Sequence, residues 1–332
     1  LLGSAKLGPG ERIFHASLVA PVGIGFTDYF ALSPDGRRVV FESLDRETGA
    51  RGLWLRELDR GEATKLESTS GGDTPFWSPD GSQIAFFADG KLKRLDLRGG
   101  PAQTICDAPT PRGGAWGPDG RIVFSPAFRA GLSIVPATGG APQPLTTLDV
   151  DREEKSHRFP GFLPGGERIL FLVQTAEGGA RNDASAIEVL ELASGERTRL
   201  IAANASPLYS SAGQLLFWRE GTLFAQRFDA SGPRLLGEPA AIASPVAFTQ
   251  NEQVLASVSN EGTLLYRAGS RGSFSSLVWL DRAGLGVKPL REKELFADFA
   301  LSPDARRLAF AVNSARAIGR PFVAQALVTA GH

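Results

Sequence analysis

A short turn signature, Ser-Pro-Asp-Gly, recurs along this chain at a nearly regular interval and limits the possible folds more than any other feature. In residues 76–86 it separates a short apolar run from a run in which apolar and polar residues alternate. Proline presets φ at the second turn position, aspartate can bond the backbone two residues further on, and glycine tolerates positive φ. The signature therefore predicts a tight turn between two antiparallel β-strands.

Seven copies of the signature can be recognised, and the fifth and sixth are eroded. After each copy comes an apolar run that ends in an aromatic residue at the same register. The interval between successive aromatics varies from 38 residues (Phe86 to Phe124) to 49 residues (Phe217 to Tyr266). The copies lie at residues 33–36, 78–81, 117–120, 163–166, 211–213, 260–262 and 302–305, and the aligned aromatics are Phe41, Phe86, Phe124, Phe171, Phe217, Tyr266 and Phe310.

Two further apolar runs follow most of these hairpins, as at residues 92–97 and 99–105. Four short strands in a period of about 45 residues are typical of a β-propeller blade, and radial repetition protects the strand edges. A β-sandwich would show no such period, and a solenoid would show a shorter one. We therefore predict an all-β chain, a β-propeller of four-stranded blades. Seven blades are expected, with six blades and the opening of a further domain as the alternative.

The repeats assign the whole chain, residues 1–332, to a single propeller domain. Residues 1–10 are interpreted as a linker and residues 11–19 as a strand that closes the ring. The last copy fits this closure, because residues 298–312 supply two strands and residues 321–329 a third, which leaves the fourth place to residues 11–19. The blades are expected to start near residues 28, 73, 112, 158, 206, 255 and 298.

Composition excludes several classes of partner. Lysine and arginine total 36, aspartate and glutamate also total 36, and so no global field attracts nucleic acid or an anionic membrane. No apolar run approaches the roughly 18 residues that span a bilayer, so membrane insertion by this segment is not expected. The single cysteine, Cys106, excludes an internal disulfide and is expected to be a buried thiol. The chain has no methionine and opens at Leu1, which suggests a segment of a longer protein.

Catalytic and cofactor motifs are not found. The sequence contains no Gly-x-Ser-x-Gly elbow and no His-Arg-Asp motif, and residues 298–300 read Asp-Phe-Ala where a kinase would need Asp-Phe-Gly. Residues 23–28 begin like a dinucleotide fingerprint but lack its third glycine. The histidines, at positions 15, 157 and 332, lie in different repeats and are not spaced as metal ligands. We predict no catalytic residue, no metal and no cofactor.

Candidate binding residues lie where loops enter the innermost strands, because in a propeller these loops converge on the axial channel. The position six residues before each turn proline is charged in the first four blades, and an aspartate stands one place later in the last. These channel-mouth candidates are Asp28, Asp73, Arg112, Arg158 and Asp298. As an alternative, the rim charges pair with one another and contribute at most about 1 kcal/mol each where exposed.

His157 is added to the candidates because residues 151–158 are the most charged run of the chain. The competing interpretation of this run is a solvated loop between blades.

The repeated Ser-Pro-Asp-Gly turn, with Gly139-Gly140 and Leu145-Thr146 near a blade end, resembles the PD40 repeat of TolB-like propellers. The run from Leu32 to Arg38 also resembles the propeller found C-terminal to the membrane span of bacterial serine/threonine protein kinases. This resemblance implies an extracytoplasmic sensor or binding domain of a membrane-anchored protein. No repeated Gly-His or Trp-Asp pair marks the blades, so the chain does not resemble a WD40 protein.

Two classes of function follow. The first is a monomeric, non-catalytic propeller that binds a peptide, a protein or a small extracellular ligand as the sensor or scaffold of a larger chain. The second is a propeller enzyme, a lyase or hydrolase, whose carboxylates at the channel mouth would come from Asp28, Asp73 and Asp298. Convergence of two of these carboxylates would favour the enzyme.

Overall fold

The computed structural model describes residues 24–45, 48–60, 62–175, 185–249 and 251–269, together with the backbone of five strands between residues 275 and 326. Every regular element in these ranges is a β-strand. Over the same residues no helix is long and apolar enough to cross a bilayer. The chain divides into two compact units, residues 1–178 with 182–269 and residues 179–181 with 270–332. Each unit is described by itself.

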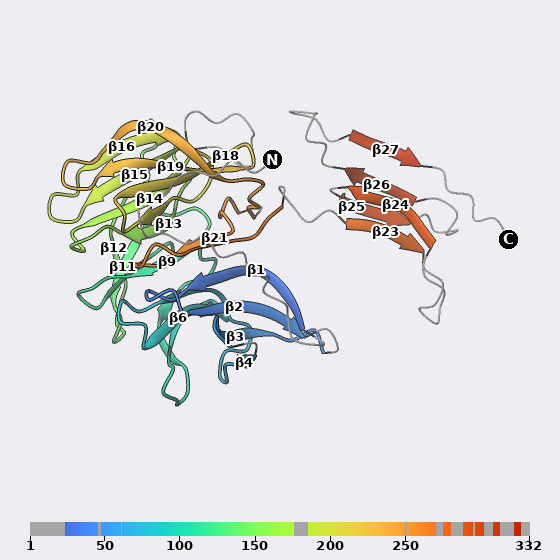
Figure 1. The fold of residues 1–332 in the computed structure, drawn as a ribbon, viewed down its shortest axis with the longest axis horizontal. Helices are drawn as coiled ribbons and strands as arrows, with labels where there is room; N and C mark the ends of the chain where they lie inside the picture. Colours follow the sequence, from blue (N-terminus) through green and yellow to red (C-terminus); the bar gives the residue numbers. More distant parts are fainter. Residues whose placement is uncertain are drawn as a thin grey trace. The chain divides into compact units, whose positions relative to one another are not determined.

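The first unit contains five antiparallel sheets of four strands each within its described residues, and the strands of each sheet follow the chain order (Figure 1). Blade 1 is β1 (Ile24–Leu32), β2 (Arg38–Asp45), β3 (Arg51–Glu57) and β4 (Ala63–Lys65), and blade 2 is β5 (Asp73–Trp77), β6 (Gln83–Ala88), β7 (Lys91–Asp96) and β8 (Gln103–Asp107). Blade 3 is β9 (Gly114–Trp116), β10 (Arg121–Phe124), β11 (Ser133–Pro136) and β12 (Gln143–Pro144). Blade 4 is β13 (Ser156–Phe162), β14 (Arg168–Gln174), β15 (Ala186–Glu191) and β16 (Arg197–Ala202). Blade 5 is β17 (Leu208–Ser210), β18 (Gln214–Arg219), β19 (Thr222–Asp229) and β20 (Arg234–Ala243).

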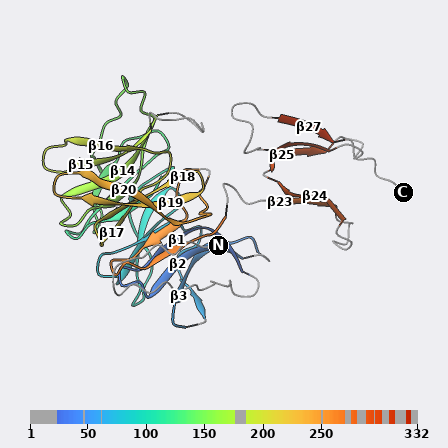
Figure 2. The same cartoon turned by 45° about the horizontal axis from the view of Figure 1, so that its top comes forward.

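The first strands of these sheets are spatial neighbours, β1 beside β5, β5 beside β9, and β9 beside β13. A two-stranded sheet of β21 (Ala256–Val258) and β22 (Leu264–Tyr266) comes next in the chain, and β21 contacts both β17 and β1. The sheets therefore follow one another around a common centre, and Figure 2 gives a second view of the same strands. This is the arrangement of a β-propeller.

The number of blades differs from the expected seven, and also from six. Within the described residues five sheets have four strands, and the sixth copy gives only β21 and β22 in the first unit. The next two strands, β23 (Ser275–Trp279) and β24 (Lys288–Glu294), pair with each other in the second unit instead of extending β22. The turn signature identifies a hairpin, and it does not determine which sheet the following strands join.

The second unit also contains the seventh copy, as a three-stranded antiparallel sheet of β25 (Phe296–Leu301), β26 (Leu308–Val312) and β27 (Phe322–Ala326). These strands lie within residues 296–326, and the sequence analysis assigned residues 298–312 and 321–329 to strands of a last blade. The predicted linker, residues 1–10, and the predicted closing strand, residues 11–19, lie outside the described residues.

Side-chain hydrogen bonds explain the turns. Ser78 Oγ donates to Asp80 Oδ1 at 2.6 Å and accepts from the backbone N of Gln83 at 2.9 Å, while Gly81 has φ +67°. The hydrogen bond from Ser78, with two from Ser82, lowers the pKa of Asp80 to about 2. In the eroded sixth copy Ser259 Oγ still accepts from the backbone N of Thr263, at 3.0 Å. The serine therefore keeps the turn where proline and aspartate have been lost.

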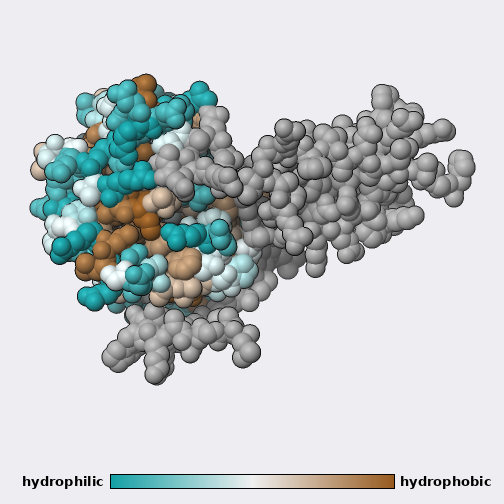
Figure 3. Space-filling model, turned by 90° about the horizontal axis from the view of Figure 1, so that it is seen from above, coloured by the Kyte–Doolittle hydropathy of each residue, from teal (hydrophilic) through white to brown (hydrophobic). Residues whose placement is uncertain are grey.

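The aligned aromatics form the core between sheets. Phe86, Phe124 and Phe171 are 0% exposed, and the equivalent residues of blades 1 and 5 are also buried. Tyr266, the sixth aromatic, is 37% exposed because β22 has no third strand beside it in its sheet. Cys106 is buried as expected, and burial raises its pKa to about 11. The face shown in Figure 3 is largely hydrophilic, with hydrophobic residues gathered in its middle.

Residues 245–269 connect blade 5 to blade 1. The hydroxyl of Ser257 accepts a hydrogen bond from the backbone N of Leu32 at 3.0 Å, and the backbone N of Asn260 donates to the carbonyl of Pro34 at 2.8 Å. An ion pair between Arg267 Nη1 and Asp28 Oδ1, at 2.5 Å, adds a third link. The described part of the first unit is therefore a ring in which a short segment joins the last blade to the first.

We expect Phe86→Ala or Phe171→Ala to lower the free energy of unfolding by about 3–5 kcal/mol, because each leaves a cavity in a fully buried core. Tyr266→Ala, at the same register but exposed, is the matched control and should cost less than about 1 kcal/mol. Urea denaturation measures all three. Equal costs at the buried and exposed positions would show that the repeat register is wrong.

Candidate functional site

In blades 2, 3 and 4 the charged residue at the entry of the first strand is followed by a residue with left-handed backbone. Thr74 (φ +44°) follows Asp73, Gly113 (φ +85°) follows Arg112, and Phe159 (φ +51°) follows Arg158. The strand register shifts at the same places, between Asp73 and Phe76 and between Arg158 and Gly161. Positive φ is unfavourable for threonine and phenylalanine, and such strain and bulges concentrate at functional sites. The irregular backbone therefore changes the direction in which these charged side chains leave the strand.

Arg112 lies over an aromatic ring. Its Nη1 donates to the carbonyl of Pro111 at 2.7 Å, and its Cζ is 5.2 Å from the ring centroid of Phe128. Nε is shielded from solvent and has no acceptor among the described residues. A buried donor without a partner costs about 1–3 kcal/mol.

Arg158 approaches the same ring from blade 4, with its Cζ 5.1 Å from the centroid of Phe128. Only 2% of its side chain is exposed, and its Nε donates to Ser156 Oγ at 3.0 Å. Its Nη1 lies 3.4 Å from Glu252 Oε2 and 3.4 Å from the carbonyl of Asn251. Arg158 is therefore held by the segment that precedes β21.

Tyr29 and Asp73 complete this group. The amide of Asn251 donates to the Tyr29 hydroxyl at 3.2 Å. Burial raises the pKa of Tyr29, and the charges of Asp73 and Glu42 raise it further. Burial also raises the pKa of Asp73, against the opposing effects of the Thr74 hydroxyl and of Arg51 and Arg112. We call the set Tyr29, Asp73, Arg112, Phe128, Arg158, Asn251 and Glu252 the mouth cluster.

Three predicted site residues, Asp28, His157 and Asp298, are not members of the mouth cluster. Asp28, next to Tyr29, pairs with Arg267, and both side chains are about half exposed. Asp298 lies in β25 of the second unit, where its backbone is opposite Ala311. Within the first unit, none of the described contacts joins Asp28 to Asp73.

His157 lies in a buried ion network. Its Nε2 is 2.9 Å from Glu154 Oε2, its Nδ1 is 2.7 Å from the Thr146 hydroxyl, and its ring packs edge-on against Phe171 at 5.1 Å. Arg197 pairs with Glu154 at 2.5 Å and with Glu188 at 2.9 Å.

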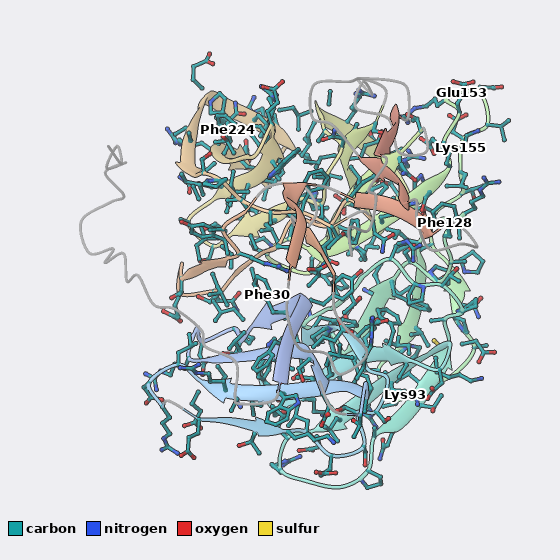
Figure 4. The ribbon with its side chains drawn as sticks, turned by 90° about the vertical axis from the view of Figure 1, so that its right-hand side faces the viewer. Phe30, Lys93, Phe128, Glu153, Lys155 and Phe224 are labelled. Carbon is teal, nitrogen blue, oxygen red and sulfur yellow. The ribbon has the colours of Figure 1, made fainter. Side chains whose placement is uncertain are left out.

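Arg152 extends this network, because it pairs with Glu154 at 3.3 Å and also with Glu188. The carboxylates of Glu154 and Glu188 are at most 1% exposed. The run 151–158 was also interpreted as a solvated loop, and the burial of Glu154 and His157 departs from that interpretation, although Glu153 and Lys155 are exposed (Figure 4).

The network shifts the pKa of Glu154. Burial alone would raise it, but the hydrogen bonds from His157, Arg197 and the backbone N of Asp149 outweigh burial and hold the pKa well below its usual range. Glu154 is thus an anion at neutral pH, and the network fixes the loop that leads to Arg158.

Sequence reasoning missed Tyr29, Phe128, Asn251 and Glu252. Tyr29 is one residue from the predicted Asp28, an offset that the bulge between Phe26 and Phe30 creates. Phe128 lies in the loop between β10 and β11 and is 36% exposed, so an aromatic residue in a Pro-Ala-Phe-Arg-Ala-Gly loop was the available signal. Asn251 and Glu252 precede the sixth repeat, whose turn signature is eroded, so no Ser-Pro-Asp-Gly motif pointed to them.

The mouth cluster contains two carboxyl groups, Asp73 and Glu252, and Glu252 is paired with Arg158. In the described parts of the chain no group of three or more His, Cys, Asp or Glu side chains could hold a metal ion. The cluster supplies guanidinium donors, a phenol, an amide and an exposed ring. These groups recognise polar ligands without a cofactor.

No protein-family model matches the chain. It is 32% identical over 147 residues to the uncharacterised peptidase YuxL of Bacillus subtilis strain 168, and the match covers 44% of this chain and 21% of that protein. The chain spans about a fifth to a half of the length of the curated relatives it matches.

Two solved structures resemble the fold. A candidate TolB from Agrobacterium tumefaciens is 16% identical with a TM-score of 0.50, over 73% of this chain and 90% of that one. An oligogalacturonate lyase from Vibrio parahaemolyticus is 12% identical with a TM-score of 0.50, over 88% of both chains. At these identities the similarity concerns the fold alone.

The Glu154 network predicts acid sensitivity. Because the folded-state pKa of Glu154 is lowered, its stabilisation is complete above the unfolded value, 4.5, and is lost as the pH falls below it. Glu154→Gln should lower the free energy of unfolding at pH 7 by about 3–5 kcal/mol, since it breaks a buried ionic network. The free energy of unfolding of this variant should also fall less steeply as the pH is lowered.

Denaturant titrations from pH 7 to pH 3 check both effects. The exposed neighbour substitution Glu153→Gln is the control and should leave the profile unchanged. If the free energy of unfolding fell equally steeply with decreasing pH in the parent and in Glu154→Gln, the prediction would be wrong.

Proposed function

We propose that this chain, which has the fold of the TolB-like β-propellers, is a non-catalytic domain that binds a peptide, a protein or a small extracellular ligand at the mouth cluster. The contrast between Arg112 and its charged neighbours carries the proposal. Asp28 pairs with Arg267, and Arg158 pairs with Glu252. Arg112 has no carboxylate within 4 Å among the described residues, and it lies beside the exposed ring of Phe128.

The wider setting follows from the resemblance of the repeats. By this resemblance we propose that the chain is the extracytoplasmic sensor or scaffold region of a larger, membrane-anchored bacterial protein such as a serine/threonine kinase. The partial coverage of the curated relatives is consistent with a region of a longer protein. In that setting the mouth cluster is the part that meets the ligand.

A propeller enzyme, a lyase or hydrolase, is the second candidate, and Asp73 is the observation that favours it. Its raised pKa and its position near the Tyr29 phenol suit a general acid. The fold is shared with an oligogalacturonate lyase, and the partial relative is called a peptidase. Against this candidate, Asp28 is paired with Arg267 and is not offered as a second acid.

Arg112→Ala should weaken ligand capture by about tenfold or more, because a charge-assisted hydrogen bond contributes roughly 1.5–3 kcal/mol. Capture is measured by pull-down and calorimetric titration with extracellular material from the native organism. Arg121→Ala is the matched control, since Arg121 lies at the opposite end of blade 3 and pairs with Asp119 on the surface. Equal capture by the three proteins would remove the mouth cluster as the site.

The two candidate functions give different results for Asp73→Asn. A binding domain should release the captured molecule unchanged from both the parent and the variant. An enzyme should convert it, and Asp73→Asn should abolish the conversion while the variant still captures the molecule. Mass spectrometry of the eluted material distinguishes these outcomes.

A further inference from the structure

We infer that the ligand of the mouth cluster carries a carboxylate next to an apolar group, with the carboxylate on Arg112 and the apolar group on Phe128. This inference rests on the proposed function and names the chemistry of its ligand. It follows from three features of the cluster: the unused donors of Arg112, the exposed ring beside them, and the acidic residues around both.

The donors of Arg112 define one half of the site. Only Nη1 has acceptors among the described residues, the carbonyls of Thr110 and Pro111 at 3.4 and 2.7 Å. Nε and Nη2 form the other edge of the guanidinium plane, and Nε has no acceptor there. Two parallel N–H donors on one edge match the two oxygens of a carboxylate. Because Nε is shielded from solvent, a ligand reaches this edge only when the guanidinium group rotates outward.

The backbone around Arg112 is held by hydrogen bonds, so the side chain starts from a defined place. The backbone N of Arg112 donates to the carbonyl of Ser125 at 3.1 Å, and its carbonyl accepts from the backbone N of Phe159 at 2.8 Å. The backbone N of Phe128 donates to the Thr110 hydroxyl at 2.9 Å. These bonds tie the two loops together, which lowers the ordering cost of binding.

Phe128 defines the other half. It is one of three large hydrophobic residues that are exposed in the described part of the chain, with Val150 and Tyr266. Three guanidinium groups lie around its ring, with the Cζ atoms of Arg112, Arg158 and Arg129 at 5.2, 5.1 and 5.9 Å from the centroid. Figure 4 shows Phe128 at the margin of the first unit. An apolar group can pack on the ring while an anion offsets the positive charge around it.

The acidic neighbours favour a carboxylate over a phosphate. Glu252 pairs with Arg158, and Asp73 begins β5, which contacts β9, the strand that Arg112 precedes. A dianionic phosphate would be repelled by both acids, whereas a single carboxylate needs only one free guanidinium edge. A carboxylate with an apolar neighbour is found at the end of a peptide with an apolar last residue, and in small aryl or alkyl acids.

In the test, the full chain is titrated with three probes, and the binding affinity of each probe is measured. These are acetyl-Ala-Ala-Phe with a free carboxylate, the same peptide as its amide, and 3-phenylpropionate. We expect amidation to weaken binding by about tenfold or more in the parent and to have no effect in Arg112→Gln. Phe128→Ala should weaken binding of both peptides, and Tyr266→Ala and Arg121→Ala are the matched controls. Thermal melting confirms that each variant is folded.

The outcomes separate this inference from the proposed function. Binding of the free peptide alone identifies a peptide terminus as the source, and equal binding of 3-phenylpropionate identifies a small acid. If the acid and the amide bind equally but Arg112→Gln binds neither, the carboxylate is excluded and the mouth cluster remains the site. Failure of all probes also overturns the inference.

A second arm uses the unidentified native ligand. Extracellular material is methyl-esterified before capture, which removes the charge of every carboxylate. We expect the Arg112-dependent fraction to be lost after esterification. Capture that depends on Arg112 and survives esterification overturns the inference, whereas the absence of any Arg112-dependent capture overturns the proposed function itself.

Discussion

Packing of one sheet against the next is the interaction on which the rest of the first unit depends. A four-stranded sheet has two apolar faces, and each is buried only when another sheet covers it. Val40 and Phe86 share one core between blades 1 and 2, Phe87 and Phe124 share the next, and Val123 and Phe171 the one after it. Every blade therefore stabilises both neighbours, and the loops that enter the first strands are brought together as a result.

The sequence predicted the blades well because their turns have a local cause. Ser78 and Asp80 bond to backbone within five residues, so these residues favour the hairpin locally. The aromatics at the shared register are buried in the five four-stranded blades, and Tyr266 of the two-stranded sheet is exposed. The number of complete blades depends instead on which sheet a strand joins. That choice is made between segments distant in sequence, and no local pattern reports it.

The candidate site was predicted in part. Arg112 and Arg158 were found from a shared register, and the structure brings them to one ring. Phe128 and Asn251 were not found, because they lie in loops of irregular length outside the repeat. A bulge in β1 also separates the environments of Asp28 and Tyr29. Periodicity therefore locates residues on strands and loses accuracy where the backbone departs from regular pairing.

The segment between β20 and the end of the first unit has two structural tasks. It joins blade 5 to blade 1 through Ser257 and Asn260, and it supplies Asn251 and Glu252 to the mouth cluster. Only two strands of this segment form a sheet in the unit, so its local opening free energy is lower than that of a four-stranded blade. A ligand held between this segment and blade 3 would resist that opening. Occupancy of the mouth cluster by the ligand and closure of the ring would then be thermodynamically linked.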